Sequence, residues 1–184
     1  QNSEVIDYVG GLDDLKKLEI KMIGNPSERF EEDPVRMIRA VRFKAKLKAT
    51  IDPNLNKSIL NNAHLIENIP PARLYEEVIK LFHNENSLEV FRELSNLGIL
   101  KYLFPQTTED EFISASLINT SQRIKIGSSV TPAFLFAVFL WSAQNKRFNE
   151  LKKKKMSRMD LMIKASEDVI KKQVQQVMMP RWLS

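Results

Sequence analysis

Signals for helix starts recur at helix-length spacing through most of this sequence, and they constrain its fold more than any other feature. Proline stands at the beginning of four stretches with helical periodicity, in Asp33-Pro34, Asp52-Pro53, Pro70-Pro71 and Thr131-Pro132. Proline suits the first turn of a helix because its φ is preset and its missing N–H would have no partner there. Asp and Thr side chains cap the free N–H groups of that turn. The sequence therefore predicts a mainly α, multi-helical fold.

The predicted helices cover residues 34–46, 53–65, 72–83, 88–97, 109–125, 132–144 and 160–177. The segment before Gly24 differs, because it is β-rich at residues 4–9, carries the pair Gly10-Gly11 and then alternates loosely. This pattern predicts a short strand, a turn, and a strand or short helix, with strand confined to the first 25 residues. Two short strands are marginal on their own, so we interpret the N-terminus as a short β remnant of a sheet whose other strands lie outside this chain.

The composition excludes several classes of chemistry. The 184 residues include no cysteine, which rules out disulfides, thiolate metal clusters and cysteine nucleophiles. His64 and His83 lack the spacing of a zinc site. The longest apolar run, 133–141, is about half of the roughly 20 residues that a membrane-spanning helix requires. We therefore expect a cytoplasmic protein without a membrane partner, and we expect it to be a monomer.

Basic residues concentrate in two places. Between Arg29 and Lys48, seven basic residues stand against three acidic ones, which accounts for most of the net charge of +5. A second run comprises Lys152, Lys153, Lys154 and Lys155. Clustered basic residues without an aromatic amphipathic face favour a polyanionic partner, such as nucleic acid or a nucleotide, over a membrane. We assign the lysine run to RNA binding, although such runs are more often solvated loops.

The first basic segment also has the periodicity of a core-facing helix, since Ile38, Val41 and Ala45 fall on one stripe. Arg36 begins a second, mostly apolar row, which is an unusual place for a purely solvated arginine. Asp33 precedes Arg36 by three residues, about 60° away on a helical wheel. This spacing predicts that the carboxylate and the guanidinium lie side by side.

Such a pair matches the edge of two nucleobases. A carboxylate accepts a hydrogen bond from an exocyclic amine while a guanidinium donates to the neighbouring ring nitrogen, a pattern that adenine and cytosine share and that guanine and uracil reverse. Asp33 and Arg36 would then select ATP and CTP, with Arg39 and Arg42 contacting phosphate or bracing the helix. On spacing alone, an ordinary surface ion pair worth about 0.2–0.5 kcal/mol explains the same residues and is the commoner case.

The sequence predicts neither a catalytic centre nor a metal centre. Asp7, Asp13 and Asp14 are the N-terminal carboxylates dense enough to suggest metal binding. Two-metal phosphoryl transfer needs converging carboxylates, and the chain has no Asp-x-Asp spacing. Turn and capping roles around Gly10-Gly11 explain these carboxylates better. We therefore assign no catalytic and no metal-binding residues.

Three segments, in fixed order, resemble the motifs of one family. Residues 7–15 are similar to D-x-x-G-G-x-x-D-L, residues 23–30 to I-G-D-P-x-x-R-F with Asn25 in place of Asp, and residues 32–43 to E-D-P-x-R-x-x-R-A-x-R-F. These motifs are those of the class II nucleotidyltransferases, the group of bacterial poly(A) polymerases and tRNA CCA-adding enzymes. The turn role of the substituted position survives, because Asn caps and turns much as Asp does.

The resemblance implies a catalytic head with Mg²⁺ ligands, a helical neck that reads the incoming base, and a helical body that binds RNA. We expect this chain to lack the head. Residues 1–23 would be the end of the nucleotidyltransferase palm, residues 24–85 the neck, and residues 86–184 a body with a truncated C-terminus. The site residues would be Asp33, Arg36, Arg39 and Arg42 for the nucleotide, and Lys152, Lys153, Lys154 and Lys155 for RNA.

Further segments, at residues 69–78, 103–105 and 131–136, resemble the poly(A) polymerase branch. The parent protein would thus add AMP from its substrate ATP to RNA 3′ ends, with Mg²⁺ as cofactor, and this fragment alone would be inactive. Two alternatives stay open. A tRNA CCA-adding enzyme would use the same Asp33 and Arg36 pair, since adenine and cytosine share the recognised edge. A non-catalytic helical RNA-binding protein would have no catalytic head encoded upstream.

Overall fold

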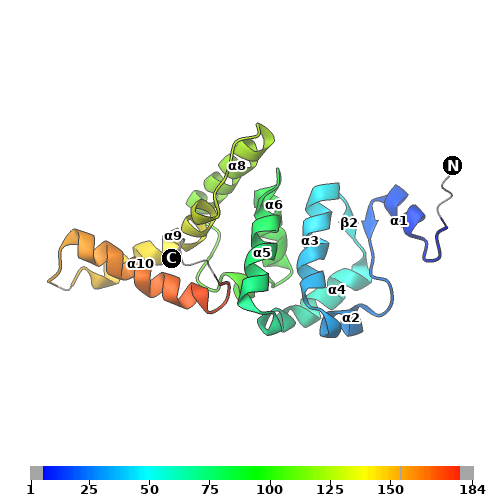
Figure 1. Cartoon of the computed structure of the whole chain (residues 1–184), viewed down its shortest axis with the longest axis horizontal. Helices are drawn as coiled ribbons and strands as arrows, with labels where there is room; N and C mark the ends of the chain where they lie inside the picture. The colour runs from blue at the N-terminus through cyan, green and yellow to red at the C-terminus, as the bar shows by residue number, and fades with distance from the viewer. Residues whose placement is uncertain (1–5, 154, 179–184) are drawn as a thin grey trace.

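The structure, a computed structural model, describes residues 6–153 and 155–178 and confirms the mainly α, multi-helical fold (Figure 1). Two short strands accompany the helices. The elements in chain order are α1 (Gly11–Lys17), β1 (Glu19–Ile20), α2 (Pro26–Glu32), α3 (Val35–Leu47), β2 (Thr50–Ile51), α4 (Pro53–Asn62), the 3₁₀ helix η1 (Ala63–Asn68), α5 (Pro71–Phe82), α6 (Ser87–Asn96), α7 (Leu100–Leu103), α8 (Glu111–Lys125), α9 (Pro132–Leu151) and α10 (Arg158–Val174).

Side-chain caps begin several of these helices, as the sequence predicts. At the start of α4, the Asp52 carboxylate accepts hydrogen bonds from the N–H groups of Asn54 and Leu55, both at 3.0 Å. At the start of α9, the Thr131 hydroxyl accepts from the N–H of Phe134 at 3.3 Å. Both helices begin with proline, so the cap and the preset φ act on the same turn.

The N-terminal segment departs from the expected strand, because residues 6–9 form none and the preceding residues lie outside the described part of the chain. The Asp7 carboxylate accepts hydrogen bonds from the N–H groups of Val9, Gly11 and Leu12 at 3.0, 3.0 and 2.8 Å. These hydrogen bonds, chiefly the one from Leu12, hold the pKa of Asp7 below its usual range. The predicted turn and capping role is therefore confirmed for this carboxylate.

The two strands pair in parallel, with Glu19 opposite Thr50 and Ile20 opposite Ile51. The prediction that strand is confined to the first 25 residues is therefore wrong. Strand β2 contains only two residues, too few to leave a period-2 pattern in the sequence. It lies directly after α3, so the short ladder ties the C-terminal end of α3 to the N-terminal segment.

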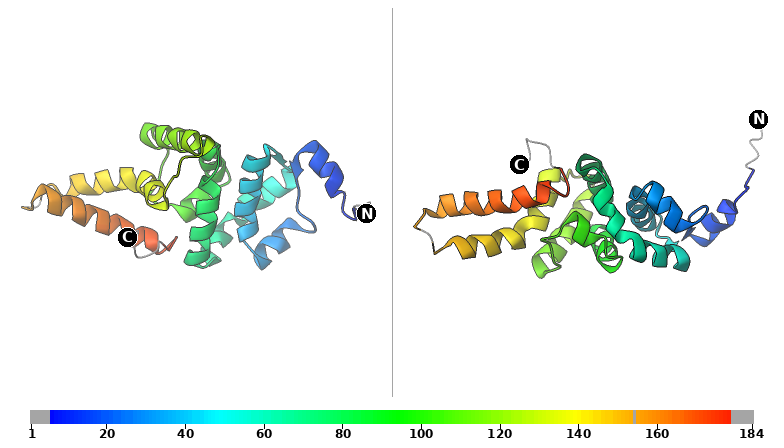
Figure 2. Two further views of the ribbon diagram at one scale, coloured as in Figure 1. Left: turned by 45° about the horizontal axis from the view of Figure 1, so that its top comes forward. Right: turned by 90° about the horizontal axis from the view of Figure 1, so that it is seen from below.

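Figures 1 and 2 show an elongated arrangement, with α1 at one end and the hairpin of α9 and α10 at the other. Helices α3, α5 and α6 stand between these ends and pack against one another. The predicted stripe on α3 is buried. The largest buried aromatic side chains of the core are Phe30, Phe82, Phe91, Phe104 and Phe139. Within the described residues, no helix combines the length and the apolar character needed to cross a membrane.

The second half of α9 leaves this core and packs against α10, with a separate apolar cluster of Leu151, Leu161 and Ala165. A two-helix hairpin buries only the face between its helices, so its outer faces stay in solvent. The apolar character of these segments predicts core positions for the aromatic residues of α9 and for the late methionines. This prediction is only partly right. Phe136 and Phe139 are buried, whereas the exposed side chains are Phe134, Trp141, Met156, Met159, Met162 and Met178. The remaining predicted core methionine, Met179, lies outside the described residues.

Candidate nucleotide-binding and RNA-binding sites

Asp33 lies at the junction of α2 and α3, where the backbone is extended (φ −150°, ψ 94°). Its Oδ2 accepts a hydrogen bond from Arg73 Nη2 of α5 at 2.9 Å, and its Oδ1 accepts from the N–H of Val35 at 3.3 Å. Helical-wheel spacing does not apply to a residue with extended backbone. Accordingly, Asp33 and Arg36 form no ion pair with each other within the described part of the chain, and each has a different partner.

Arg36 is held by Glu32, the last residue of α2. Arg36 Nη1 donates to Glu32 Oε2 at 2.9 Å and to the Arg29 carbonyl at 3.2 Å. Arg29 Nη1 donates to both oxygens of Glu32 at 3.0 Å. The hydrogen bonds from Arg29 and then Arg36 hold the pKa of Glu32 below its usual range. The side chains of Asp33 and Arg36 stay 22% and 34% exposed, so a carboxylate and a guanidinium are restrained here and still accessible to a ligand.

Arg39 and Arg42 meet a buried carboxylate on the neighbouring helix. Glu77 of α5 is 3% exposed, and its Oε1 and Oε2 accept hydrogen bonds from Arg39 Nη2 at 3.3 Å and Arg42 Nη1 at 3.2 Å. The Lys80 ammonium lies 3.5 Å from the same carboxylate. A buried carboxylate needs such partners, because its desolvation is otherwise costly. Of the two roles predicted for these arginines, the contacts match bracing of the helix.

Two residues of this arrangement, Arg73 and Glu77, are absent from the sequence-based assignment. They lie four residues apart on α5 and therefore share one face of that helix. That face packs against α3, and it supplies a guanidinium to Asp33 and a carboxylate to Arg39 and Arg42. The sequence does show opposite charges four residues apart after the Pro70-Pro71 helix start. This spacing does not reveal the partners of the two side chains, which lie 35 to 40 residues away.

The described residues of the lysine run lie at the tip of the hairpin between α9 and α10, at the opposite end of the molecule from α1 (Figure 1). Lys152, Lys153 and Lys155 are exposed. The Lys152 ammonium lies 5.2 Å from the centre of the Phe148 ring, which is within the range of a cation–π contact. Lys154 lies outside the described residues. The run is thus separated from Asp33 and Arg36 by the length of the helical body.

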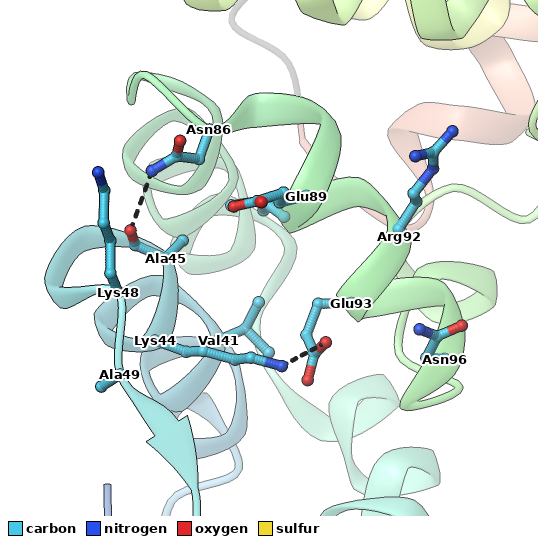
Figure 3. A pocket seen from close by; sticks show the side chains of 11 residues that line it. Val41, Lys44, Ala45, Lys48, Ala49, Asn86, Glu89, Arg92, Glu93 and Asn96 are labelled. Carbon is cyan, nitrogen blue, oxygen red and sulfur yellow. Dashed lines mark hydrogen bonds and ion pairs between the residues drawn. The ribbon is translucent and has the colours of Figure 1, made fainter. Parts of the chain in front are cut away.

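A cavity of about 590 Å³ is lined by residues of α3 and α6 (Figure 3). Lys44 Nζ lies 2.6 Å from Glu93 Oε2 across it, and the Asn86 side-chain amide donates to the Ala45 carbonyl at 3.1 Å. Its three basic side chains face two acidic ones, including Glu89. Because its charges nearly balance and several are already paired, this cavity has little preference for a polyanion.

The described residues do not fit a metal centre. No three His, Cys, Asp or Glu side chains in ranges 6–153 and 155–178 converge closely enough to hold an ion. Two-metal nucleotidyl transfer needs several carboxylates around ions about 3.5–4 Å apart. Asp7 is committed to capping α1, and Asp13 and Asp14 pair with Lys16 and Lys21. These carboxylates are therefore assigned structural roles and no step that involves Mg²⁺.

Comparisons with known sequences identify the class of this helical fold. Residues 49–111 match the family model described as "Probable RNA and SrmB- binding site of polymerase A". The chain is 44% identical over 147 residues to poly(A) polymerase I of Salmonella typhi, covering 74% of this chain and 32% of that protein. It is 41% identical over 118 residues to the CCA-adding enzyme of Limosilactobacillus reuteri, covering 64% of this chain and 29% of that enzyme.

Solved structures share the fold. The Thermotoga maritima CCA-adding enzyme complexed with tRNA matches with a TM-score of 0.69 at 22% identity, over 97% of this chain and 39% of that one. A CCA-adding enzyme in complex with CTP matches with a TM-score of 0.66 at 23% identity, over 90% of this chain and 41% of that one. These matches show that the helical fold of this chain is shared with part of each solved structure.

The chain belongs to the class II nucleotidyltransferase family, and its identity to poly(A) polymerase I is higher and longer than its identity to this CCA-adding relative. The resemblance predicted from the motifs is thereby confirmed. The chain spans about a third of the length of these curated relatives.

Proposed function

We propose that this chain is part of a template-independent polynucleotide adenylyltransferase that adds AMP from ATP to RNA 3′ ends. The 44% identity to poly(A) polymerase I supports this activity for the parent protein. In this proposal residues 1–23 end the palm, residues 24–85 form the neck that selects the base, and residues 86–184 form the body that binds RNA. The parent protein acts as a cytoplasmic monomer.

The base-selecting pair is Asp33 with Arg36. The Asp33 carboxylate accepts a hydrogen bond from the adenine N6 amine, and the Arg36 guanidinium donates to N1. Arg73 and Glu32 position the two groups by the contacts at 2.9 Å described above. Arg39 and Arg42 keep α3 in register with α5 through Glu77. The single observation that carries this assignment is the restrained, partly exposed acceptor and donor at the α2–α3 junction.

Kinetics of the parent protein with ATP, CTP, GTP and UTP test this pair. Loss of a hydrogen bond to a charged partner costs about 1.5–3 kcal/mol, roughly a tenfold to hundredfold loss. Arg36→Ala should therefore lower kcat/KM for ATP and narrow its preference over GTP and UTP by that factor. Arg92→Ala is the matched control, since Arg92 lies on α6 and also forms an ion pair, with Glu109 at 2.8 Å. Wild-type nucleotide ratios in Arg36→Ala would reduce Arg36 to a structural partner of Glu32.

RNA binding is assigned to Lys152, Lys153, Lys154 and Lys155. The three described lysines are exposed, and exposed lysines bind phosphate without sequence preference. Replacement of all four by Gln should weaken RNA binding and lower the slope of log K against log salt by up to about 0.7 for each phosphate that is no longer neutralised, measured by fluorescence anisotropy. An unchanged salt slope would remove this assignment.

The isolated 184-residue chain should transfer no AMP. We infer that the Mg²⁺ ligands of the parent protein lie outside this chain, since the described residues offer no converging carboxylates. Incubation with ATP, Mg²⁺ and an RNA primer should show no primer extension. Extension above a metal-free control would contradict this inference.

A second candidate function is tRNA CCA addition, favoured by the 41% identity to a CCA-adding enzyme. Adenine and cytosine share the edge that Asp33 and Arg36 recognise, so the pair does not separate the two activities. Assays of the parent protein with CTP and a tRNA lacking its 3′ CCA, beside ATP and a generic RNA 3′ end, distinguish them. Extension of the generic RNA by many adenylates supports poly(A) addition.

A further inference from the structure

A groove of about 680 Å³ lies between the C-terminal ends of α3 and α5. Helix α3 and its C-cap contribute Arg42, Phe43, Lys46 and Lys48 to its lining, and α5 contributes Lys80. The groove is separate from the cavity of Figure 3, although Lys48 and Asn86 line both. None of the roles proposed above uses Phe43, Lys46 or Lys48.

The groove has an excess of positive charge. Its lining has four basic side chains and one carboxylate, that of Glu85. Arg42 and Lys80 share the Glu77 carboxylate behind the lining, whereas Lys46 and Lys48 form no ion pair within the described residues. Basic residues in the last turn of a helix also interact favourably with the partial negative charge of the free carbonyl groups at that end. That interaction accounts for part of the charge and leaves the aromatic residue among these cations unexplained.

Phe43 is that aromatic residue. It is 41% exposed, while the phenylalanines nearest the core, such as Phe82 and Phe91, are fully buried. The Arg42 guanidinium lies 5.1 Å from the centre of the Phe43 ring and also donates to Glu77. The ring is therefore braced by a cation that is itself fixed to α5. An exposed ring among basic side chains is the combination by which proteins bind single-stranded nucleic acid, through base stacking and phosphate contacts.

Phe43 also shares a helix face with Arg36. The two residues are seven positions apart, which is about two turns of helix and roughly 10.5 Å along its axis. Stacked nucleotides are about 3.4 Å apart along one strand, so the interval matches about three stacked nucleotides. A strand that passes Arg36 therefore reaches Phe43 by following the same face of α3.

We propose that this groove binds single-stranded RNA, with one base stacked on Phe43 and the adjacent phosphates contacted by Lys46, Lys48 and Lys80. The inference rests on the proposed function for the nature of the substrate, RNA. It assigns a binding site to the neck end of the helical region, in addition to the lysine run at the hairpin tip.

Anisotropy of a fluorescein-labelled 12-nucleotide oligo(A), titrated with the 184-residue chain at fixed salt, tests the stacking contact. Phe43→Ala should weaken binding by roughly five- to 150-fold, the range expected for loss of one base–aromatic stack, and Phe43→Trp should restore it. Phe134→Ala is the matched control, because Phe134 is 40% exposed and lies on α9 outside the groove. It should stay within twofold of the wild type.

The phosphate contacts are tested by salt dependence. Lys46→Gln should lower the slope of log K against log salt by about 0.7. The control Lys57→Gln, on the exposed side of α4, should leave the slope unchanged. An RNA duplex of the same length should compete poorly, since its bases are not free to stack on Phe43.

Three outcomes would overturn the inference: equal affinity of wild type and Phe43→Ala, competition by the duplex as strong as by the single strand, or no binding of oligo(A). Should Phe43→Ala unfold by circular dichroism, Phe43→Leu replaces it with the same expected direction. Nucleotide ratios of the parent protein test Arg36 in a separate assay. Failure of the groove is therefore distinguishable from failure of the proposed base selection.

Discussion

Two regions of this molecule use ion pairs in different ways. Between α3 and α5, the carboxylate is buried, with Glu77 only 3% exposed beneath Arg39 and Arg42. In the α9–α10 hairpin, Arg147 pairs with Asp168 at 2.8 Å and Glu150 at 3.0 Å, and these carboxylates are 24% and 50% exposed. Water screens both partners in the second set, whereas in the first set the carboxylate is buried and only Arg39 and Arg42, 41% and 21% exposed, reach solvent. The comparison shows that ion pairs with a buried carboxylate fix the positions of α3 and α5, whereas similar ion pairs in the α9–α10 hairpin lie at a solvated surface.

The sharpest test of the contrast between packed core and solvated hairpin lies within α9, whose first half packs in the main core and whose second half packs in the hairpin. Phe139 is fully buried, with ring centres 4.7 Å from Phe82 and 4.4 Å from Phe104, whereas Trp141 is 44% exposed. Phe139→Ala should lower the free energy of unfolding by about 3–5 kcal/mol through the cavity it leaves. Trp141→Ala should cost clearly less, because part of its surface is already in water. Urea denaturation of both variants measures the difference. Equal losses in the free energy of unfolding would contradict the contrast between the packed core and the hairpin.

Sequence patterns predicted the local part of this contrast and missed the long-range part. The caps by Asp52 and Thr131 were predictable because each bonds N–H groups two or three residues away. Burial of Glu77 was not, because its partners are 35 and 38 residues distant.

Periodicity had a similar limit at the late methionines. It correctly indicated a helix around Met159 and Met162, but a helix with one neighbour has the same period as a helix within a core. Their exposure follows from the number of packing partners, which a single sequence does not encode.

At the candidate site, residue type and order predict a nucleotide-binding role for Asp33 and Arg36, and this role stays a prediction, whereas the direct pairing predicted for them is absent from the described residues. Side-by-side pairing requires helical backbone at Asp33, and the extended φ and ψ there place this residue outside the helical periodicity of α3. Arg73 supplies the missing guanidinium from 40 residues away.

The next largest effect concerns the buried carboxylate. Glu77→Ala leaves Arg39 and Arg42 without their shared acceptor and should lower the free energy of unfolding by about 2–3 kcal/mol. Glu150→Ala removes one exposed partner of Arg147 and should cost at most about 0.5 kcal/mol. Urea denaturation at neutral pH compares them. If the two costs were similar, burial of Glu77 would carry no energetic consequence and the contrast between the regions would be geometric only.

The smallest expected effect is a pH dependence at Glu32, an exposed carboxylate with a structural partner in the proposed site. Hydrogen bonds from Arg29 and Arg36 hold its pKa below the ordinary value of 4.5 in the folded chain. A carboxyl group with a lowered folded pKa stabilises the protein above its unfolded pKa, and this stabilisation is lost as pH falls through the folded value. Wild-type stability from Glu32 should therefore decline below about pH 4.5. Urea denaturation between pH 6 and 3 should show a shallower decline for Glu32→Gln than for wild type. Glu31 forms no ion pair within the described residues. The control Glu31→Gln should therefore retain the wild-type dependence of stability on pH. A Glu32→Gln variant with that same dependence would show that the contacts with Arg29 and Arg36 do not persist in solution.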